Sequence, residues 1–216
     1  EIVLIKYHSE VFYDYMDEDD VENIVESAYL GKLKGRWAVG INELFNNSFR
    51  MNSENNPEWI EPVSDGLTPM KSAFDLVSEI SDAWISGDVP HHDSVPPIIL
   101  NITDGVGTDY DYDQELIDSI NNLKSLKTNE GNLLLLNLFL SDTSNVNELS
   151  DDTSGLDQYG KLLYNHSSKL TDSMCSEAKV NGFKHVKPGI TRGFMENGDY
   201  KNIVSFLKIG TSVTKV

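Results

Sequence analysis

Two apolar runs in the middle of the chain are nearly continuous rather than alternating. Pro97 to Thr103 reads PIILNIT, and Asn132 to Leu140 reads NLLLLNLFL. Strands of this kind are buried on both faces, which is typical of parallel sheets. Two further stretches, Ile2 to Tyr7 and Thr191 to Phe194, predict strands nearer the two ends of the chain.

Helical periodicity separates the predicted strands. From Pro69 to Ile85, apolar residues recur at three- and four-residue spacing. Thr68 is placed to cap this helix, because a threonine hydroxyl accepts a hydrogen bond from a first-turn amide, and Pro69 suits the first position. The same periodicity predicts three further helices: Gln114 to Leu126, Leu156 to Val180 with a break near Ser167, and Asn202 to Ile209.

The alternation of strands and helices predicts the fold class. It favours an α/β domain with three layers, a doubly wound, mostly parallel central sheet flanked by helices. The chain has 216 residues and a mass of 24.2 kDa, enough for one such domain with a sizeable core. Asn46 to Asp65, rich in Asn, is expected to be a long loop and is too short for a domain linker. We therefore expect a single domain over residues 1–216.

The charge balance limits the classes of partner. The chain has 17 Lys and Arg against 35 Asp and Glu, a formal net charge of -18. Nucleic-acid binding depends on cationic contacts with phosphates, so this balance argues against nucleic acid. We expect partners that are neutral, basic or bridged by a metal ion.

Hydropathy and cysteine content bear on location. The mean hydropathy is -0.35. No apolar run approaches the roughly 18 residues of a membrane span. Cys175 is the single cysteine, so the chain cannot form an internal disulfide. With no signal peptide visible, a cytoplasmic location is expected.

Two loops are candidates for metal binding, because each adjoins a predicted element and offers an oxygen ligand. One contains Gly66 and Thr68, and the other contains Asp104 and Gly105. In a doubly wound sheet both loops would emerge at the carboxyl edge, where the Thr68 hydroxyl and the Asp104 carboxylate could reach one Mg²⁺ ion. The alternative is that Thr68 is only a helix cap and Asp104 only a turn residue.

The order of these motifs resembles bacterial von Willebrand factor A domains. The resemblance rests on Gly66-x-Thr68-Pro69-Met70, on the helix that carries Trp84, and on Pro96-Pro97-Ile98-Ile99-x-Asn101-Ile102-Thr103-Asp104-Gly105. It continues through Thr128–Leu135 with Asn137 and Ser141, Arg192–Phe194, Asn197, Asp199 and Phe206–Thr211. The chain is most similar to the cytoplasmic branch that includes tellurium-resistance-associated proteins.

The resemblance implies a metal-ion-dependent adhesion site. Thr68 matches the family's Thr ligand and Asp104 its later Asp ligand of Mg²⁺ (or Mn²⁺), while Gly66 and Gly105 let the two loops approach the ion. The sequence has no Asp-x-Ser-x-Ser, the motif of the family's first strand. Ile2 to Tyr7 resembles the second strand, so we expect the first strand either to precede Glu1 or to come from another chain.

The function that the resemblance implies is a non-enzymatic module for protein–protein interaction. The metal would accept one carboxylate from a partner protein, such as a kinase or phosphatase, in a stress-response or defence complex. The alternative is a metal-free scaffolding subunit with a vestigial adhesion site, and the missing Asp-x-Ser-x-Ser favours it.

Other motifs give weaker hypotheses. Asp109-x-Asp111-x-Asp113 is spaced like a calcium loop, but Gln114 and Ile120 replace the Gly and Glu that an EF-hand requires. The same acids raise the hypothesis of an Mg²⁺-dependent phosphotransfer enzyme, although nothing in the sequence would fix their geometry. No hydrolase elbow or P-loop occurs, so no catalytic residues are predicted.

Overall fold

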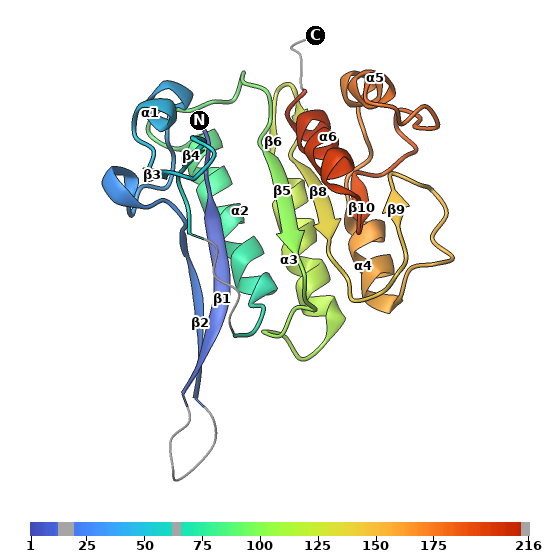
Figure 1. Ribbon diagram of the computed structural model, residues 1–216, viewed down its shortest axis with the longest axis horizontal. Helices are drawn as coiled ribbons and strands as arrows, with labels where there is room; N and C mark the ends of the chain where they lie inside the picture. Colours follow the sequence, from blue (N-terminus) through green and yellow to red (C-terminus); the bar gives the residue numbers. More distant parts are fainter. Residues whose placement is uncertain (13–19, 62–65, 213–216) are drawn as a thin grey trace. The chain divides into compact units, whose positions relative to one another are not determined.

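The computed structural model describes residues 1–12, 20–61 and 66–212 (Figure 1). It shows a mixed α/β protein, in which the described residues form six α-helices and a four-stranded, mostly parallel sheet. The chain divides into two compact units. The first comprises Glu1–Leu76 and Gly107–Tyr112, and the second comprises Val77–Val106 and Asp113–Val216. That residues 1–216 form a single domain stays a prediction.

The first unit begins with a β-hairpin. Strands β1 (Ile5–Phe12) and β2 (Asp20–Ser27) pair antiparallel in a sheet of their own. Lys6 lies opposite Glu26, and their side chains form a 2.9 Å ion pair. The sequence predicted only the beginning of β1 and missed β2, whose residues DVENIVES mix carboxylates with apolar side chains.

A small core follows the hairpin. The chain continues through a 3₁₀ helix η1 (Gly31–Leu33) and helix α1 (Ile41–Asn46). The buried side chains of this core are Tyr29, Leu33, Val39 and Leu44. Two polar aromatic groups tie it together: the Tyr29 hydroxyl donates to the Ile2 carbonyl at 2.8 Å, and the Trp59 indole N–H donates to the Leu44 carbonyl at 2.7 Å.

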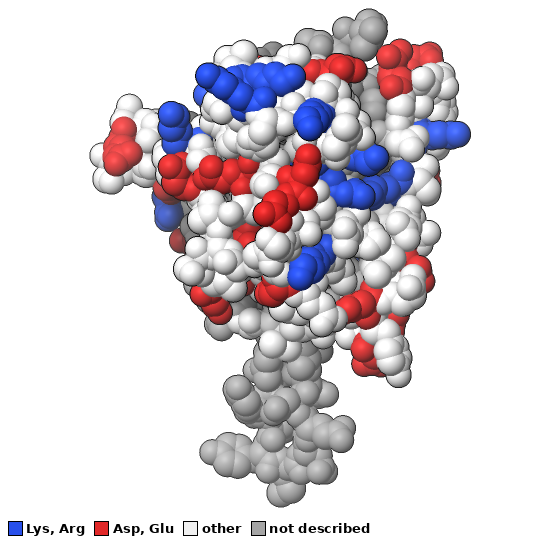
Figure 2. All heavy atoms as spheres, turned by 90° about the vertical axis from the view of Figure 1, so that its right-hand side faces the viewer, with Lys and Arg blue, Asp and Glu red and all other residues white. Residues whose placement is uncertain are grey.

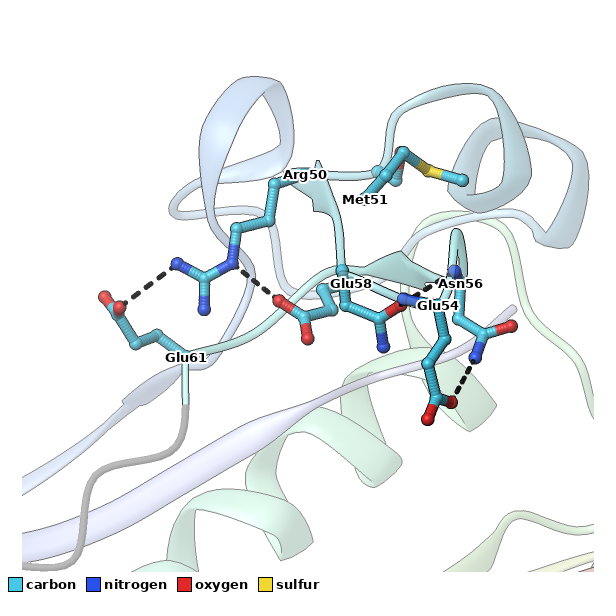
Figure 3. Close-up of polar contacts among 8 residues, drawn as sticks. Arg50, Met51, Glu54, Asn56, Glu58 and Glu61 are labelled. Atoms are coloured by element: carbon cyan, nitrogen blue, oxygen red, sulfur yellow. Dashed lines mark hydrogen bonds and ion pairs between the residues drawn. The ribbon is translucent and has the colours of Figure 1, made fainter.

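The predicted loop from Asn46 to Asp65 contains a short hairpin, and residues 62–65 lie outside the described residues. Strand β3 (Arg50–Met51) pairs antiparallel with β4 (Pro57–Glu58). Figure 3 shows the Arg50 guanidinium between Glu58 and Glu61, at 2.6 and 3.4 Å. The hydrogen bond that Arg50 donates to the Glu58 carboxylate raises the pKa of Arg50. The segment is therefore not an irregular loop, because a tight turn and an ion-pair cluster order it.

The second unit contains the parallel sheet, in the order β5-β8-β10-β9. β5 (Ile98–Thr103), β8 (Leu134–Phe139) and β10 (Phe194–Glu196) run parallel, and β9 (Asn147–Glu148) is antiparallel to β10. Its other elements are α3 (Asp113–Ser125), β6 (Lys127–Thr128), β7 (Gly131–Asn132), α4 (Gln158–His166), α5 (Asp172–Val180) and α6 (Tyr200–Thr211). α2 (Met70–Ser86) begins in the first unit and ends in the second.

Side chains of β8 alternate between two environments, as the strand pleat requires. Leu136 and Leu138 pack in a cluster that includes Met174 and Cys175 of α5 and Phe206 of α6. The opposite side carries Asn137, whose amide donates to the Ser167 hydroxyl beside α4 at 2.9 Å and accepts from Asn101 of β5 at 2.9 Å. Both asparagines within the apolar strands are thus hydrogen-bonded, as burial requires.

The strongest sequence patterns gave accurate element positions. The helices predicted from Pro69 and Gln114 match α2 and α3, and the predicted break near Ser167 is confirmed by the gap between α4 and α5. The last predicted strand lies two or three residues later than expected, as β10.

Cys175 is buried in the core, and burial raises the pKa of its thiol.

Candidate functional site

Three loops follow the three parallel strands at the carboxyl edge of the sheet in the second unit. Asp104 follows β5, Ser141 follows β8 and Asn197 follows β10. Backbone hydrogen bonds hold the strand ends together: Leu140 N–H donates to Thr103 at 2.8 Å, and Asn197 N–H donates to Phe139 at 3.0 Å. This is the edge where ligands bind in open α/β sheets, so we take it as the candidate site.

The turn after β5 displays Asp104 to solvent. The Thr103 hydroxyl donates to the Gly105 carbonyl at 3.0 Å and closes the turn. Asp104 is exposed, and its carboxylate makes no hydrogen bond or ion pair within the described residues. Gly105 thus belongs to a tight turn, and Asp104 is available to a ligand from outside the chain.

The loop after β8 is folded around the side chain of Asn197. The Asn197 amide nitrogen lies 2.9 Å from the Ser141 hydroxyl, 2.9 Å from the Thr143 carbonyl and 3.1 Å from the Asn145 carbonyl. Asn197 has a φ of 49°, a left-handed conformation that Asn tolerates better than most residues. Ser141 and Asn197 entered the sequence analysis only as part of the family resemblance, and their contact joins residues far apart in the chain.

A buried carboxylate lies beside this loop. Glu196, at the end of β10, is 0% exposed. One carboxylate oxygen accepts a hydrogen bond from the Ser141 hydroxyl at 2.7 Å, while Oε2 has no hydrogen-bond partner among the described residues. A buried oxygen without a partner is costly, so a hydrogen-bond donor or a cation at Oε2 would stabilise it. Sequence reasoning missed Glu196, which reads as an ordinary polar residue after a short strand.

The predicted Thr68 loop belongs to the first unit. Thr68 N–H donates to the Thr108 hydroxyl at 3.0 Å, and Thr108 N–H donates to the Thr68 carbonyl at 2.9 Å. The Thr68 hydroxyl makes no hydrogen bond to a described residue. Because Thr68 and Asp104 belong to different units, their pairing around one cation stays a prediction.

The prediction that Thr68 caps α2 is wrong. The first-turn amides of Lys71 and Ser72 donate to the two carboxylate oxygens of Asp109, at 3.0 and 2.7 Å. A carboxylate accepts such bonds more strongly than a hydroxyl and also interacts favourably with the helix dipole. These two hydrogen bonds therefore hold Asp109 in place. From the sequence, we had expected nothing to fix its position.

Gly66 has a structural role that the sequence did not reveal. Its φ is +78°, and a Cβ atom built there would overlap the Ser9 carbonyl and lie 2.8 Å from the Ser9 carbonyl carbon. The next residue, Leu67, accepts a hydrogen bond from Ser9 N–H at 3.1 Å. Glycine is therefore required here for the close approach of this loop to β1.

The described residues contain no cluster of three or more His, Cys, Asp or Glu side chains that could hold a metal ion. Nor do they include a helix that is both long and apolar enough to cross a membrane.

Comparison with known proteins gives no relative. No protein-family model, curated protein or solved structure matches the chain.

Proposed function

We propose that this chain is a protein-interaction module, and that a Mg²⁺ ion at Asp104 takes part in the contact with its partner. The observation that carries the proposal is the exposed Asp104 carboxylate, which has no protein partner in the described residues and lies at the carboxyl edge of the parallel sheet. Hard cations take carboxylate, hydroxyl and carbonyl oxygens. The loops after β5, β8 and β10 offer all three.

The proposal includes the architecture of a von Willebrand factor A domain. Three parallel strands with helices between them support this three-layer, doubly wound arrangement. In it, water would complete the coordination of a cation at Asp104.

The metal would accept a carboxylate from the partner protein. Because the chain carries a net charge of -18, a partner with a basic rim around that carboxylate would be favoured. The proposed setting is a cytoplasmic complex with a kinase or phosphatase. The resemblance in motif order supports this part of the proposal.

Calorimetric titration of Mg²⁺ and Mn²⁺ into the purified chain tests the proposal. We expect saturable binding that Asp104→Asn weakens by about tenfold or more, since a ligand carboxylate is lost. Asp82→Asn is the matched control, because Asp82 is an exposed aspartate of α2. Binding heat that is absent, or equal in wild type and Asp104→Asn, would support the metal-free scaffold instead.

A further inference from the structure

A pocket lined with cations lies at the amino edge of the sheet in the second unit, opposite the edge that carries Asp104. Its volume is about 320 Å³. Lys124, Lys169 and Arg192 line it, together with Ser167, Ser168 and the segment 132–134 at the start of β8. Figure 2 views the side that carries α5 and β9, where Lys and Arg side chains lie among Asp and Glu side chains. A pocket lined by three cations is unexpected in a chain with a net charge of -18.

Lys124 and Arg192 are held by successive carbonyls at the end of α4. The Lys124 ammonium donates to the His166 carbonyl at 2.7 Å, and the Arg192 Nη1 donates to the Ser167 carbonyl at 2.7 Å. The Arg192 guanidinium also lies 5.7 Å from the centre of the Tyr164 ring. Both cationic groups are thus fixed in place and close to each other.

Lys169 and Arg192 face each other across an antiparallel β-bridge. Side chains directly opposite in such a pair lie about 5 Å apart at Cβ, and like charges there are destabilising. Together with Lys124, these two residues bring three cations into the lining of one pocket. None of the three forms an ion pair with a carboxylate of the described residues. Within the described part of the chain, the Asp151 carboxylate accepts a hydrogen bond only from the Thr191 hydroxyl, at 3.4 Å.

Unused hydrogen-bond donors remain in the pocket. A guanidinium has five N–H groups and an ammonium three, whereas one bond of each is used by α4 carbonyls. Ser168, which is 8% exposed, accepts from Leu135 N–H at 2.9 Å, and its own hydroxyl proton is not donated to any described residue.

The electrostatics of neighbouring groups agree with a concentration of positive charge. Burial lowers the pKa of Lys124, and the charge of Arg192 lowers it further. Burial also lowers the pKa of His166, to which Lys124 and Arg192 add their repulsion. The carbonyl end of α4 carries a partial charge of only about -0.5, so it does not neutralise three cations.

We propose that Lys124, Lys169, Arg192 and Ser168 bind the phosphate group of a small phosphorylated molecule. A phosphate dianion would accept from both the planar guanidinium and the ammonium groups, and it would relieve the repulsion between them. The pocket volume is at the lower end of the range for small-ligand sites, which fits a phosphate with a small organic group. This inference is independent of the proposed metal site.

Calorimetric titration at constant ionic strength tests the proposal, with inorganic phosphate and glycerol 3-phosphate as probes and sodium chloride as the balancing salt. We expect saturable binding of both, with tighter binding of glycerol 3-phosphate if the organic group is also contacted. Binding of inorganic phosphate alone would restrict the site to the free anion and overturn the assignment to a phosphorylated molecule.

Three variants and one control localise the binding. Lys124→Gln and Arg192→Lys should each weaken it by about tenfold, because each removes charge-assisted donors. Lys169→Gln should weaken it less. Since the Lys169 side chain is exposed, this variant is expected to fold even if the others do not, and circular dichroism checks each. Lys161→Gln, on the exposed side of α4, should bind as wild type does. No saturable binding, or equal loss in the Lys161 variant, would overturn the proposal.

Discussion

At the scale of single residues, two residues have structural roles that the sequence did not reveal. Gly66 allows a loop to approach β1, and Glu196 brings a carboxylate into the core. The sequence predicted Asp104 as a metal ligand because it directly follows a strongly apolar strand, and this role stays a prediction. Glu196 and Arg192 were not identified, because their surroundings come from residues far away in the chain: Ser141 is 55 positions from Glu196, and Lys124 is 68 positions from Arg192.

Gly66→Ala should destabilise the chain much more than Gly35→Ala. Both glycines have nearly the same positive φ, +78° and +77°, but a Cβ at Gly35 meets nothing within 4 Å. We expect a loss of about 1 kcal/mol for Gly35→Ala, from the backbone conformation alone, and about 3 kcal/mol for Gly66→Ala. Urea unfolding measures both, and equal losses would show that contact with Ser9 is unimportant.

Glu196→Gln should raise the free energy of unfolding by about 1 kcal/mol, because the amide keeps an acceptor for the Ser141 hydroxyl and replaces a buried carboxylate oxygen that has no partner within the described residues. Thermal unfolding in the presence of a chelator measures the change, with Glu130→Gln as an exposed control. A variant less stable than wild type would show that the carboxylate has partners beyond Ser141.

At the scale of elements, hydrophobic periodicity was sufficient to predict a helix or strand that buries a continuous stripe or run of apolar side chains. α2, α3, β5 and β8 could therefore be predicted closely. β2 and the β3–β4 hairpin could not, because cross-strand pairs, an Asn52-centred turn and the Arg50 ion pairs specify them rather than burial. The cap of α2 was missed for the same reason, since its carboxylate comes from a loop 37 to 38 residues away.

Asp109→Ala should destabilise α2 by about 1–2 kcal/mol, the usual cost of losing a capping side chain. Asp111→Ala, in the same acidic run and exposed, should change stability by less than about 0.5 kcal/mol. Denaturant unfolding of the two variants provides the comparison. Equal losses of stability would mean that α2 depends on the negative charge of the whole acidic run. The two hydrogen bonds of Asp109 would then not be specifically required.

The end of α4 should respond to pH. His166 has a pKa lowered by burial and by Lys124 and Arg192, so folding favours its neutral form. Its contribution to stability is fully present above its unfolded pKa of about 6.5 and is lost as the pH falls toward the lower folded value. Between about pH 7 and pH 5, wild type should lose more stability than His166→Gln in urea unfolding. Parallel pH profiles of the two proteins would contradict this.

At the scale of the whole molecule, the charges are distributed unevenly. The chain is strongly acidic, yet the second unit gathers three cations at one edge of its sheet and shows an unpaired carboxylate at the other. The two edges therefore suit ligands of opposite charge. We propose a cation and a protein partner at the carboxyl edge, and a phosphate group at the amino edge.

The most direct test of the central claim is to locate the metal. Mn²⁺ added in small amounts to the ¹⁵N-labelled chain broadens amide signals close to the ion. We predict that the signals of Gly105 and its neighbours are lost selectively. This loss should be absent in Asp104→Asn, and excess Mg²⁺ should reverse it. Broadening spread over exposed acids such as Asp82 and Asp118, unchanged in the variant, would contradict a metal-dependent interaction site.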